Sequence, residues 1–353
     1  MEAGSIFLSL VLILLCARIF GEAAAWLKIP PVMGEMLAGI ILGPSLLGWV
    51  ELNDVIQSLA EIGLILLLFE VGLDTDISKL AKHGTKASVV ALGGFIAPFF
   101  GGFALSYWLF DLPLLLSMFI GGTLTATSIG VTVRVLRDLK RHKSHEAQVV
   151  LGAAVLDDIL GVVLLALLYE FSVSGGINLT NASKIFIFIA IFMMLAPIMA
   201  KLMAITIGRY DKQSKVSGLV PTTIVTLVLF FAWLAHLVGA PALLGGFAAG
   251  LALSRFFFLP FGVTLVQSDQ QFVSRIERLM RPIIQLFTPI FFVVVGLSLN
   301  LQEVDWSSAS ILWMAAAFIV LAIFSKLAGA FLIQESTHFR WVVGLAMIPR
   351  AEV

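Results

Sequence analysis

The chain has 353 residues, of which 60% are hydrophobic and 12% are charged, and its 22 basic and 22 acidic residues balance to a formal net charge of zero. Soluble domains carry about 25% charged residues, so this composition excludes an ordinary soluble protein. The balanced charge gives no sign of a nucleic-acid partner, and the single cysteine, Cys16, excludes a disulfide framework. We therefore expect an all-α polytopic membrane protein surrounded by membrane lipids.

Twelve apolar segments follow one another along the chain, and each is long enough to predict a transmembrane helix. They cover residues 4–27, 31–49, 55–73, 85–109, 112–136, 147–170, 183–208, 219–238, 241–256, 282–299, 309–333 and 341–353. The first is too long for the core of a signal peptide, so we interpret it as a span. The last is cut short by the end of the sequence. We therefore expect a single membrane domain over 1–353 that is incomplete at its C-terminus, with about 12 of a total of 13 spans visible.

Basic residues gather in every second loop between these segments. The fifth loop, "RDLKRHKSHE", is the richest, whereas the second and tenth loops carry mainly acidic residues. Because positively charged loops stay in the cytoplasm, this alternation predicts that the odd-numbered loops are cytoplasmic and that the N-terminus is outside. We expect a multi-pass protein of a bacterial-type inner (plasma) membrane. In the long ninth loop, the second half predicts either an amphipathic helix on the membrane surface or a plain connector.

Three charged residues lie near the middle of predicted spans: Asp157 and Asp158 in the sixth, and Lys326, the only mid-span lysine that we identify, in the eleventh. A charge at the centre of a transmembrane helix costs about 2.5–3.5 kcal/mol, so such residues usually have a function. Neighbouring residues of a helix point about 100° apart. We therefore expect one aspartate to face a partner helix, with Lys326 as its natural partner, and the other to face a cavity, where it can hold a proton or a small cation but not both.

Other charges within or near the spans have a structural explanation that is as good as a functional one, since ion pairs and caps at helix ends account for them. They are Arg18, Glu22, Glu35, Glu61 and Glu70.

The fifth span contains "GGTLTATSIGVTV", in which three glycines accompany a run of hydroxyl side chains. This composition predicts a helix that unwinds in the membrane beside an ion site, although close helix packing through small residues is an open alternative. The twelfth span has a second candidate break at "IPRAEV", where a proline interrupts the apolar run. In the tenth span, Pro289 and Gly296 are explained equally well by an ordinary kink.

The two halves of the chain correspond. A broken fifth span precedes the helix with the two aspartates, and the helix with Lys326 precedes the broken twelfth span. The two broken spans run in opposite directions across the membrane, as an inverted repeat requires, and such repeats place their ion site near the midplane.

At these residues the chain resembles the monovalent cation:proton antiporter-2 (CPA2) family, and most of all its NapA-type sodium/proton antiporters. The matching stretches lie in the family's order over nearly the whole chain: "IPPVMGEMLAGIILGPSLLG", "LLLFEVGLDTD", "TLTATSIGVTVRVL", "GAAVLDDILG", "SKLAGA" and "PRAEV". The resemblance implies an NhaA/NapA-like fold with inverted repeats and two broken crossing helices. It also implies core (ion-translocation) helices at about 55–170 and 282–353, and dimerisation helices at about 4–49 and 183–256, in a homodimer.

The resemblance also implies roles for individual residues. Asp158 resembles the carboxylate that carries the ion, Asp157 resembles the carboxylate that pairs with the core lysine, and Lys326 resembles that lysine. Both aspartates would contribute to the Na⁺ site. The residues that match the two unwound crossovers are Thr125, Ala126, Thr127, Ser128, Arg350 and Glu352.

The residues and the resemblance together predict a secondary active, electrogenic Na⁺/H⁺ antiporter, with Li⁺ and K⁺ as other candidate cations. The resemblance implies that it works by elevator-type alternating access. We expect no enzyme activity and no cofactor besides the transported ions. The alternatives are a K⁺/H⁺ antiporter or Kef-like potassium efflux system, and a membrane sensor derived from a transporter. An intramembrane hydrolase is disfavoured, because two adjacent aspartates diverge too much on a helix to share one scissile bond.

Overall fold

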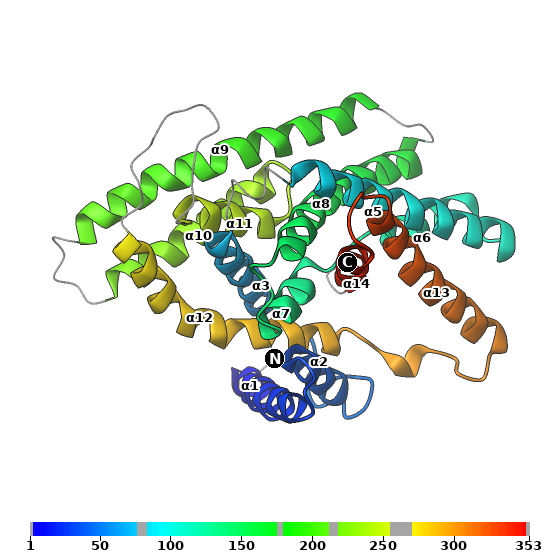
Figure 1. Cartoon of the computed structure of the whole chain (residues 1–353). Helices are drawn as coiled ribbons and strands as arrows, with labels where there is room; N and C mark the ends of the chain where they lie inside the picture. The colour runs from blue at the N-terminus through cyan, green and yellow to red at the C-terminus, as the bar shows by residue number, and fades with distance from the viewer. Residues whose placement is uncertain (1–2, 76–82, 175–178, 212–217, 255–269, 351–353) are drawn as a thin grey trace.

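The computed structural model describes residues 3–75, 83–174, 179–211, 218–254 and 270–350. Within these ranges the regular secondary structure is all helical, with thirteen α-helices, two short helical turns and no strand (Figure 1). The α-helices are α1 (Ala3–Trp26), α2 (Pro31–Leu42), α3 (Asp54–Asp74), α5 (Gly84–Ala104), α6 (Leu114–Thr123), α7 (Ile129–Asp138), α8 (His145–Ser174), α9 (Leu179–Asp211), α10 (Leu219–Leu237), α11 (Ala242–Leu253), α12 (Gln270–Leu297), α13 (Ala309–Phe331) and α14 (Thr337–Ala346). The turns are η1 (Leu105–Leu109) and η2 (Leu301–Glu303).

Each of the twelve predicted spans contains a helix, which confirms the all-helical membrane fold. Eight helices are long and apolar enough to cross a membrane alone, and α2, α6 and α11 are shorter apolar helices. The fifth predicted span holds two helices, α6 and α7, which are separated by the non-helical residues 124–128. Helix α14 ends at Ala346, before Pro349, so the predicted second break also begins where the sequence places it.

The predicted surface helix of the ninth loop is instead the start of α12. Residues 255–269 lie outside the described part of the chain. From Gln270 onward one continuous helix runs to Leu297. Its apolar positions Val273, Ile276 and Met280 are buried in the protein core, so this face packs on protein and not on lipid.

The helices pack in two groups. The first group consists of α1, α2, α3, α9, α10, α11 and α12, with α3 packed closely against α11 and α12. Close approach depends on glycine: a Cβ at Gly72 would lie 2.3 Å from the carbonyl oxygen of Phe247, and a Cβ at Gly250 would lie 2.1 Å from that of Phe69. Backbone contacts of this kind make the first group a rigid unit, because the interface has no room to adjust.

The second group consists of α5, α6, α8, α13 and α14 (Figure 1). Its own apolar cluster joins α5, α8, α13 and α14, and a Cβ at Gly329 of α13 would lie 2.4 Å from the backbone nitrogen of Gly94 of α5. Helix α7 lies between the groups and contacts α8 on one side and α2 and α3 on the other.

The functional division into core and dimerisation helices stays a prediction. The packing itself places α3 and α12 with α2 and α11, whereas the resemblance assigned residues 55–73 and 282–299 to the ion-translocating part. The first group is thus larger than the predicted dimerisation domain.

Candidate functional site

The centre of the site is a buried ion pair between α8 and α13. The ammonium Nζ of Lys326 lies 2.7 Å from Oδ2 of Asp157, and both side chains have no solvent-exposed surface. The hydroxyl of Thr127 donates a second hydrogen bond to the same oxygen, at 2.5 Å. The pairing expected from the sequence is therefore present, and Thr127 adds a donor that fixes the carboxylate.

The other oxygen of Asp157 is available to a ligand. Oδ1 is buried and accepts no hydrogen bond from the described residues. A buried carboxylate oxygen without a donor carries a desolvation cost, which a bound proton or cation would offset. Hard cations are bound by oxygen ligands such as this one.

The break between α6 and α7 exposes carbonyl oxygens that two cationic side chains satisfy. A helix end leaves its last carbonyls without intrahelical partners. Lys326 donates to the carbonyl of Thr125 at 2.5 Å, and Arg350 donates to the carbonyls of Leu124 and, at 3.2 Å, Ala322. Cations at the C-terminal end of a half-helix also oppose its dipole. Lys326 thus joins the broken helix to the aspartate, and Arg350 reaches the same break from the second crossover.

The two non-helical segments cross each other here. The backbone N–H of Ser128 donates to the carbonyl of Pro349 at 2.8 Å, and the hydroxyl of Thr132 donates to the carbonyl of Ala346 at 2.8 Å. The side chain of Ser128 caps α7 by accepting from the N–H of Val131. Ala126 lies within the unwound stretch. The structure therefore brings together the predicted crossover residues, except Glu352, which lies outside the described residues.

Asp158 lies on a different face of α8 from Asp157. Asp157 is 2% exposed, whereas Asp158 is partly exposed. Residues four and seven positions apart share a helix face. Asp158 therefore lies above Ala154 and Leu151, both of which line a pocket, while Asp157 faces α13.

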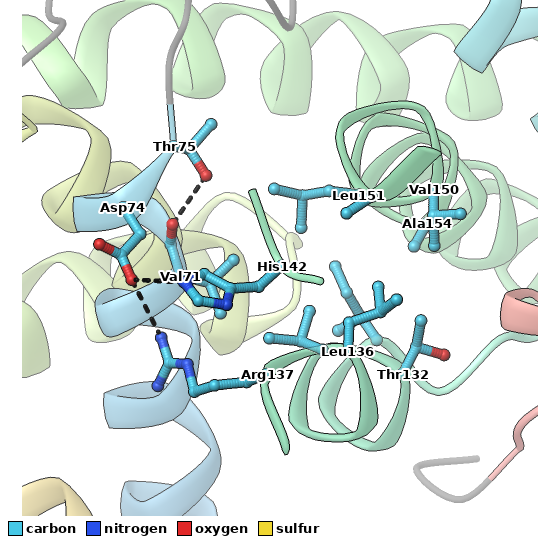
Figure 2. Close-up of a pocket in the computed structure, with 13 residues that line it drawn as sticks. Val71, Asp74, Thr75, Thr132, Leu136, Arg137, His142, Val150, Leu151 and Ala154 are labelled. Carbon is cyan, nitrogen blue, oxygen red and sulfur yellow. Dashed lines mark hydrogen bonds and ion pairs between the residues drawn. The ribbon is translucent and has the colours of Figure 1, made fainter. Parts of the chain in front are cut away.

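Figure 2 shows this pocket, which lies between α3, α7 and α8. Its floor is apolar, with Val150, Leu151 and Ala154 of α8 on one side. On another side Asp74 of α3 forms an ion pair with Arg137 of α7 at 3.5 Å, and Nε2 of His142 lies 3.8 Å from the same carboxylate (Figure 2). The pocket includes Arg137 and His142, so it lies at the end of the bundle that carries the basic fifth loop, and Asp158 follows its α8 wall one turn further along the helix.

Ion pairs and backbone contacts explain most of the remaining charges in the spans. Arg18 donates to the carbonyl of Gln285 at 2.8 Å, and Glu22 accepts from the indole N–H of Trp26 at 3.1 Å. Glu35 pairs with Arg134 at 3.5 Å. The structural explanation therefore suffices for Arg18 and Glu22.

Glu70 and Glu61 complete this set, and α9 adds a residue that the sequence reading missed. Glu70 forms an ion pair with Arg137, and Glu61 is exposed. Lys201, within the predicted span 183–208, is only 3% exposed. Lys326 is thus not the only buried lysine among the described residues. The lysine inside the apolar run "APIMAKLMAI" could have predicted this second buried charge.

Comparisons with known proteins find sodium/hydrogen exchangers, both as a family and as individual relatives. The family described as "Sodium/hydrogen exchanger, transmembrane" matches residues 10–353. The chain is 32% identical to the probable Na⁺/H⁺ antiporter GerT of Bacillus cereus, over 98% of this chain and 88% of GerT. It is 31% identical to the Na⁺/H⁺-K⁺ antiporter GerN of the same organism, over 98% of this chain and 85% of GerN.

A solved structure has the same fold. The sodium/proton antiporter MjNhaP1 from Methanocaldococcus jannaschii superposes with a TM-score of 0.67 at 17% identity, over 97% of this chain and 85% of MjNhaP1.

Proposed function

The chain belongs to the sodium/hydrogen exchanger family, and from that premise we propose that it is a secondary antiporter that exchanges Na⁺ for H⁺ across a cell membrane. The observation that carries the proposal is the arrangement around the broken helix. A lysine and an aspartate are paired without solvent, and the next residue, Asp158, is partly exposed on the face of α8 whose earlier turns line a pocket.

The chemistry of this arrangement favours exchange over one-way conduction. Asp158 binds either a proton or a cation, because one carboxylate cannot hold both, and this competition couples the two fluxes. In the proton-loaded state Lys326 pairs with Asp157, as in the structure. A cation that draws on Oδ1 of Asp157 weakens this pair, and Lys326 then releases its own proton. More protons than cations cross in each cycle, so the transport is electrogenic.

The two packing groups support alternating access by an elevator-type movement. Each group is held internally by glycine-mediated backbone contacts, so each can move as a unit. We propose that the second group, with α7 attached through the crossover, carries the site past the first group. We propose from the distribution of basic loops that the pocket faces the cytoplasm and that the N-terminus is outside, which would make this arrangement an inward-facing one. We also expect a homodimer with α1 among its contacts.

Potassium is the second candidate substrate, and one specific finding favours it. GerN, which is 31% identical to this chain, is named a Na⁺/H⁺-K⁺ antiporter. The residues at the break are oxygen donors that can bind either ion, so the geometry supports monovalent cation exchange more firmly than it supports a choice of cation.

The proposal is tested with purified protein in proteoliposomes under an imposed pH gradient. Proton movement is followed by the recovery of a quenched pH-sensitive dye after addition of Na⁺, Li⁺ or K⁺, with and without a membrane potential. We expect Na⁺ to collapse the gradient, with a rate that depends on the potential. Asp158→Asn should abolish the response, whereas Glu61→Gln, a change at an exposed carboxylate of α3, should leave it intact.

Each outcome has a distinct meaning. A response to K⁺ alone would keep the site and change the substrate. A response that is independent of the potential would remove the role of Lys326 as a titrating group. Normal exchange by Asp158→Asn would overturn the assignment of the ion-carrying carboxylate. If no cation moves protons, the sensor alternative replaces the transporter.

A further inference from the structure

A row of ion pairs joins the two groups of helices at the mouth of the pocket. Arg134 of α7 lies 3.5 Å from Glu35 of α2. One turn further, Arg137 pairs with Glu70 and lies 3.5 Å from Asp74, both on α3. The three carboxylates thus belong to the first group, and the two guanidinium groups belong to the half-helix that the crossover ties to the second group.

These contacts differ in kind from those that hold each group together. Inside the groups, helices contact each other backbone to backbone at glycines. At the seam, apolar residues of α7 and α8, among them Val131 and Leu151, pack with the core of the first group, and long charged side chains lie beside the pocket (Figure 2). Long charged side chains can change partners without a change in the backbone packing, so this seam is suited to relative movement.

The spacing of the charges matches one helical turn on both sides. Glu70 and Asp74 are four residues apart on α3, and Arg134 and Arg137 are three apart on α7; at 1.5 Å per residue these separations are about 6 and 4.5 Å. Both helices run towards the basic fifth loop. If α7 moves outward by one turn, Arg137 reaches the level at which Arg134 now meets Glu35, and it leaves Asp74 for Glu70 alone.

The burial of Glu35 requires some such exchange. Its side chain is 3% exposed, and its Oε2 atom accepts no hydrogen bond from the described residues. Removing Arg134 without a replacement would leave a buried carboxylate without a counter-charge, which is a costly state. One-turn shifts of one element past another are a known form of conformational switching.

We propose that Glu35, Glu70 and Asp74 form, with Arg134 and Arg137, a charge ladder that holds the second group in its inward position and along which α7 moves by exchanging partners. These are positioning residues, since they set which side of the membrane Asp158 faces and do not bind the ion. The inference rests on the proposed function, because it assigns the ladder a place in the transport cycle. Other charges at the ladder are Asp138, which pairs with Arg134, and Lys143 and His142, which approach Asp74.

The experiment measures access to the pocket from the cytoplasmic side. Cys16 is replaced by serine, and Leu151→Cys supplies one thiol on the pocket wall. The rate of its reaction with a membrane-impermeant methanethiosulfonate is measured in inside-out vesicles. Glu70→Gln and Arg137→Gln are each expected to slow the reaction by about threefold or more, as the second group leaves the inward position. The double variant should be no slower than Arg137→Gln alone, since that change already removes the contact with Glu70.

A matched control comes from an ion pair that lies within the second group. Lys86, at the start of α5, pairs with Glu335, which lies between α13 and α14. Lys86→Gln and Glu335→Gln should leave the thiol reaction unchanged. A wider pocket mouth from loss of a side chain would speed the reaction, so a slower reaction cannot arise in that way. Unchanged or faster labelling in both ladder variants, or additive effects in the double variant, overturns the ladder.

The two proposals fail separately. If the parent protein exchanges Na⁺ for H⁺ and the ladder variants label as the parent does, the ladder is wrong and the function stands. If the parent shows no exchange but the ladder variants still slow the labelling, the ladder is a conformational latch in a protein whose function is not transport.

Discussion

Lys326 and Asp157 have no exposed side-chain surface, so the charge on each is stabilised in the protein interior by the other. Removing one partner of a buried ion pair leaves an uncompensated charge and costs about 3–5 kcal/mol. We expect Lys326→Met to lower the free energy of unfolding of the detergent-solubilised protein by about that amount. Adding Asp157→Asn should restore most of the loss, because the asparagine is neutral and keeps its contact with Thr127.

Thermal unfolding of the four proteins of this double-mutant cycle measures the effect. Exchange activity should stay absent in both variants that lack Lys326, so recovery of stability and recovery of function are separated. Equal unfolding midpoints for Lys326→Met and the parent would show that the pair contributes nothing to the fold.

In helix α12, a backbone hydrogen bond that a proline removes is replaced by one from another helix. Pro289 has no N–H, so the carbonyl of Gln285 four residues earlier loses its helical partner. Arg18 of α1 donates to that carbonyl at 2.8 Å. We expect Arg18→Met to cost about 1–3 kcal/mol by leaving the carbonyl unsatisfied.

The same substitution should cost much less in a Pro289→Ala background, because the alanine supplies the missing N–H. Chemical denaturation of the two single variants and the double variant measures the coupling. Arg18 would be assigned to another role if its removal cost the same in both backgrounds.

The crossing of α3 and α11 gives a prediction about packing. A Cβ at Gly250 would lie 2.1 Å from the carbonyl oxygen of Phe69, and the obstacle is backbone, which cannot move aside. We expect Gly250→Ala to destabilise the protein by about 1–3 kcal/mol, as overpacking does. Gly161→Ala on α8 is the control, since a Cβ there meets nothing within 4 Å. Unfolding midpoints of the two variants decide the matter, and equal midpoints would contradict a rigid first group.

At the scale of the whole molecule, the sequence was sufficient for those features that depend on spacing along one helix. Hydrophobic length predicted the twelve segments, and the divergence of neighbouring residues separated the surroundings of Asp157 from those of Asp158. Contacts between helices that are far apart in the sequence leave no such spacing pattern from which they could be predicted. Thr127 as a donor to Asp157, and Arg18 as the partner of a carbonyl on α12, depend on how helices cross. Glu352 and the functional domain boundaries remain predictions.

The junction between the two groups also predicts a dependence of stability on pH. Burial lowers the pKa of His142 below its ordinary value of 6.5, and the nearby charges of Arg137 and Lys143 act in the same direction, against the opposing effect of Asp74. Its Nδ1 atom is buried and has no hydrogen-bond partner among the described residues, which also suits the neutral ring. The folded protein therefore binds fewer protons at this site than the unfolded chain does just below pH 6.5.

Stability contributed by His142 is thus complete above pH 6.5 and is lost as the pH falls through the lowered pKa. The parent protein should lose more stability than His142→Gln between about pH 7.5 and 5.5, since glutamine has no proton to bind in this window. Thermal unfolding of both proteins across this range measures the difference. Parallel curves would mean that protonation of His142 does not oppose the folded arrangement of α3, α7 and α8. A steeper curve for the parent would identify this junction as the part of the molecule that acidification weakens first.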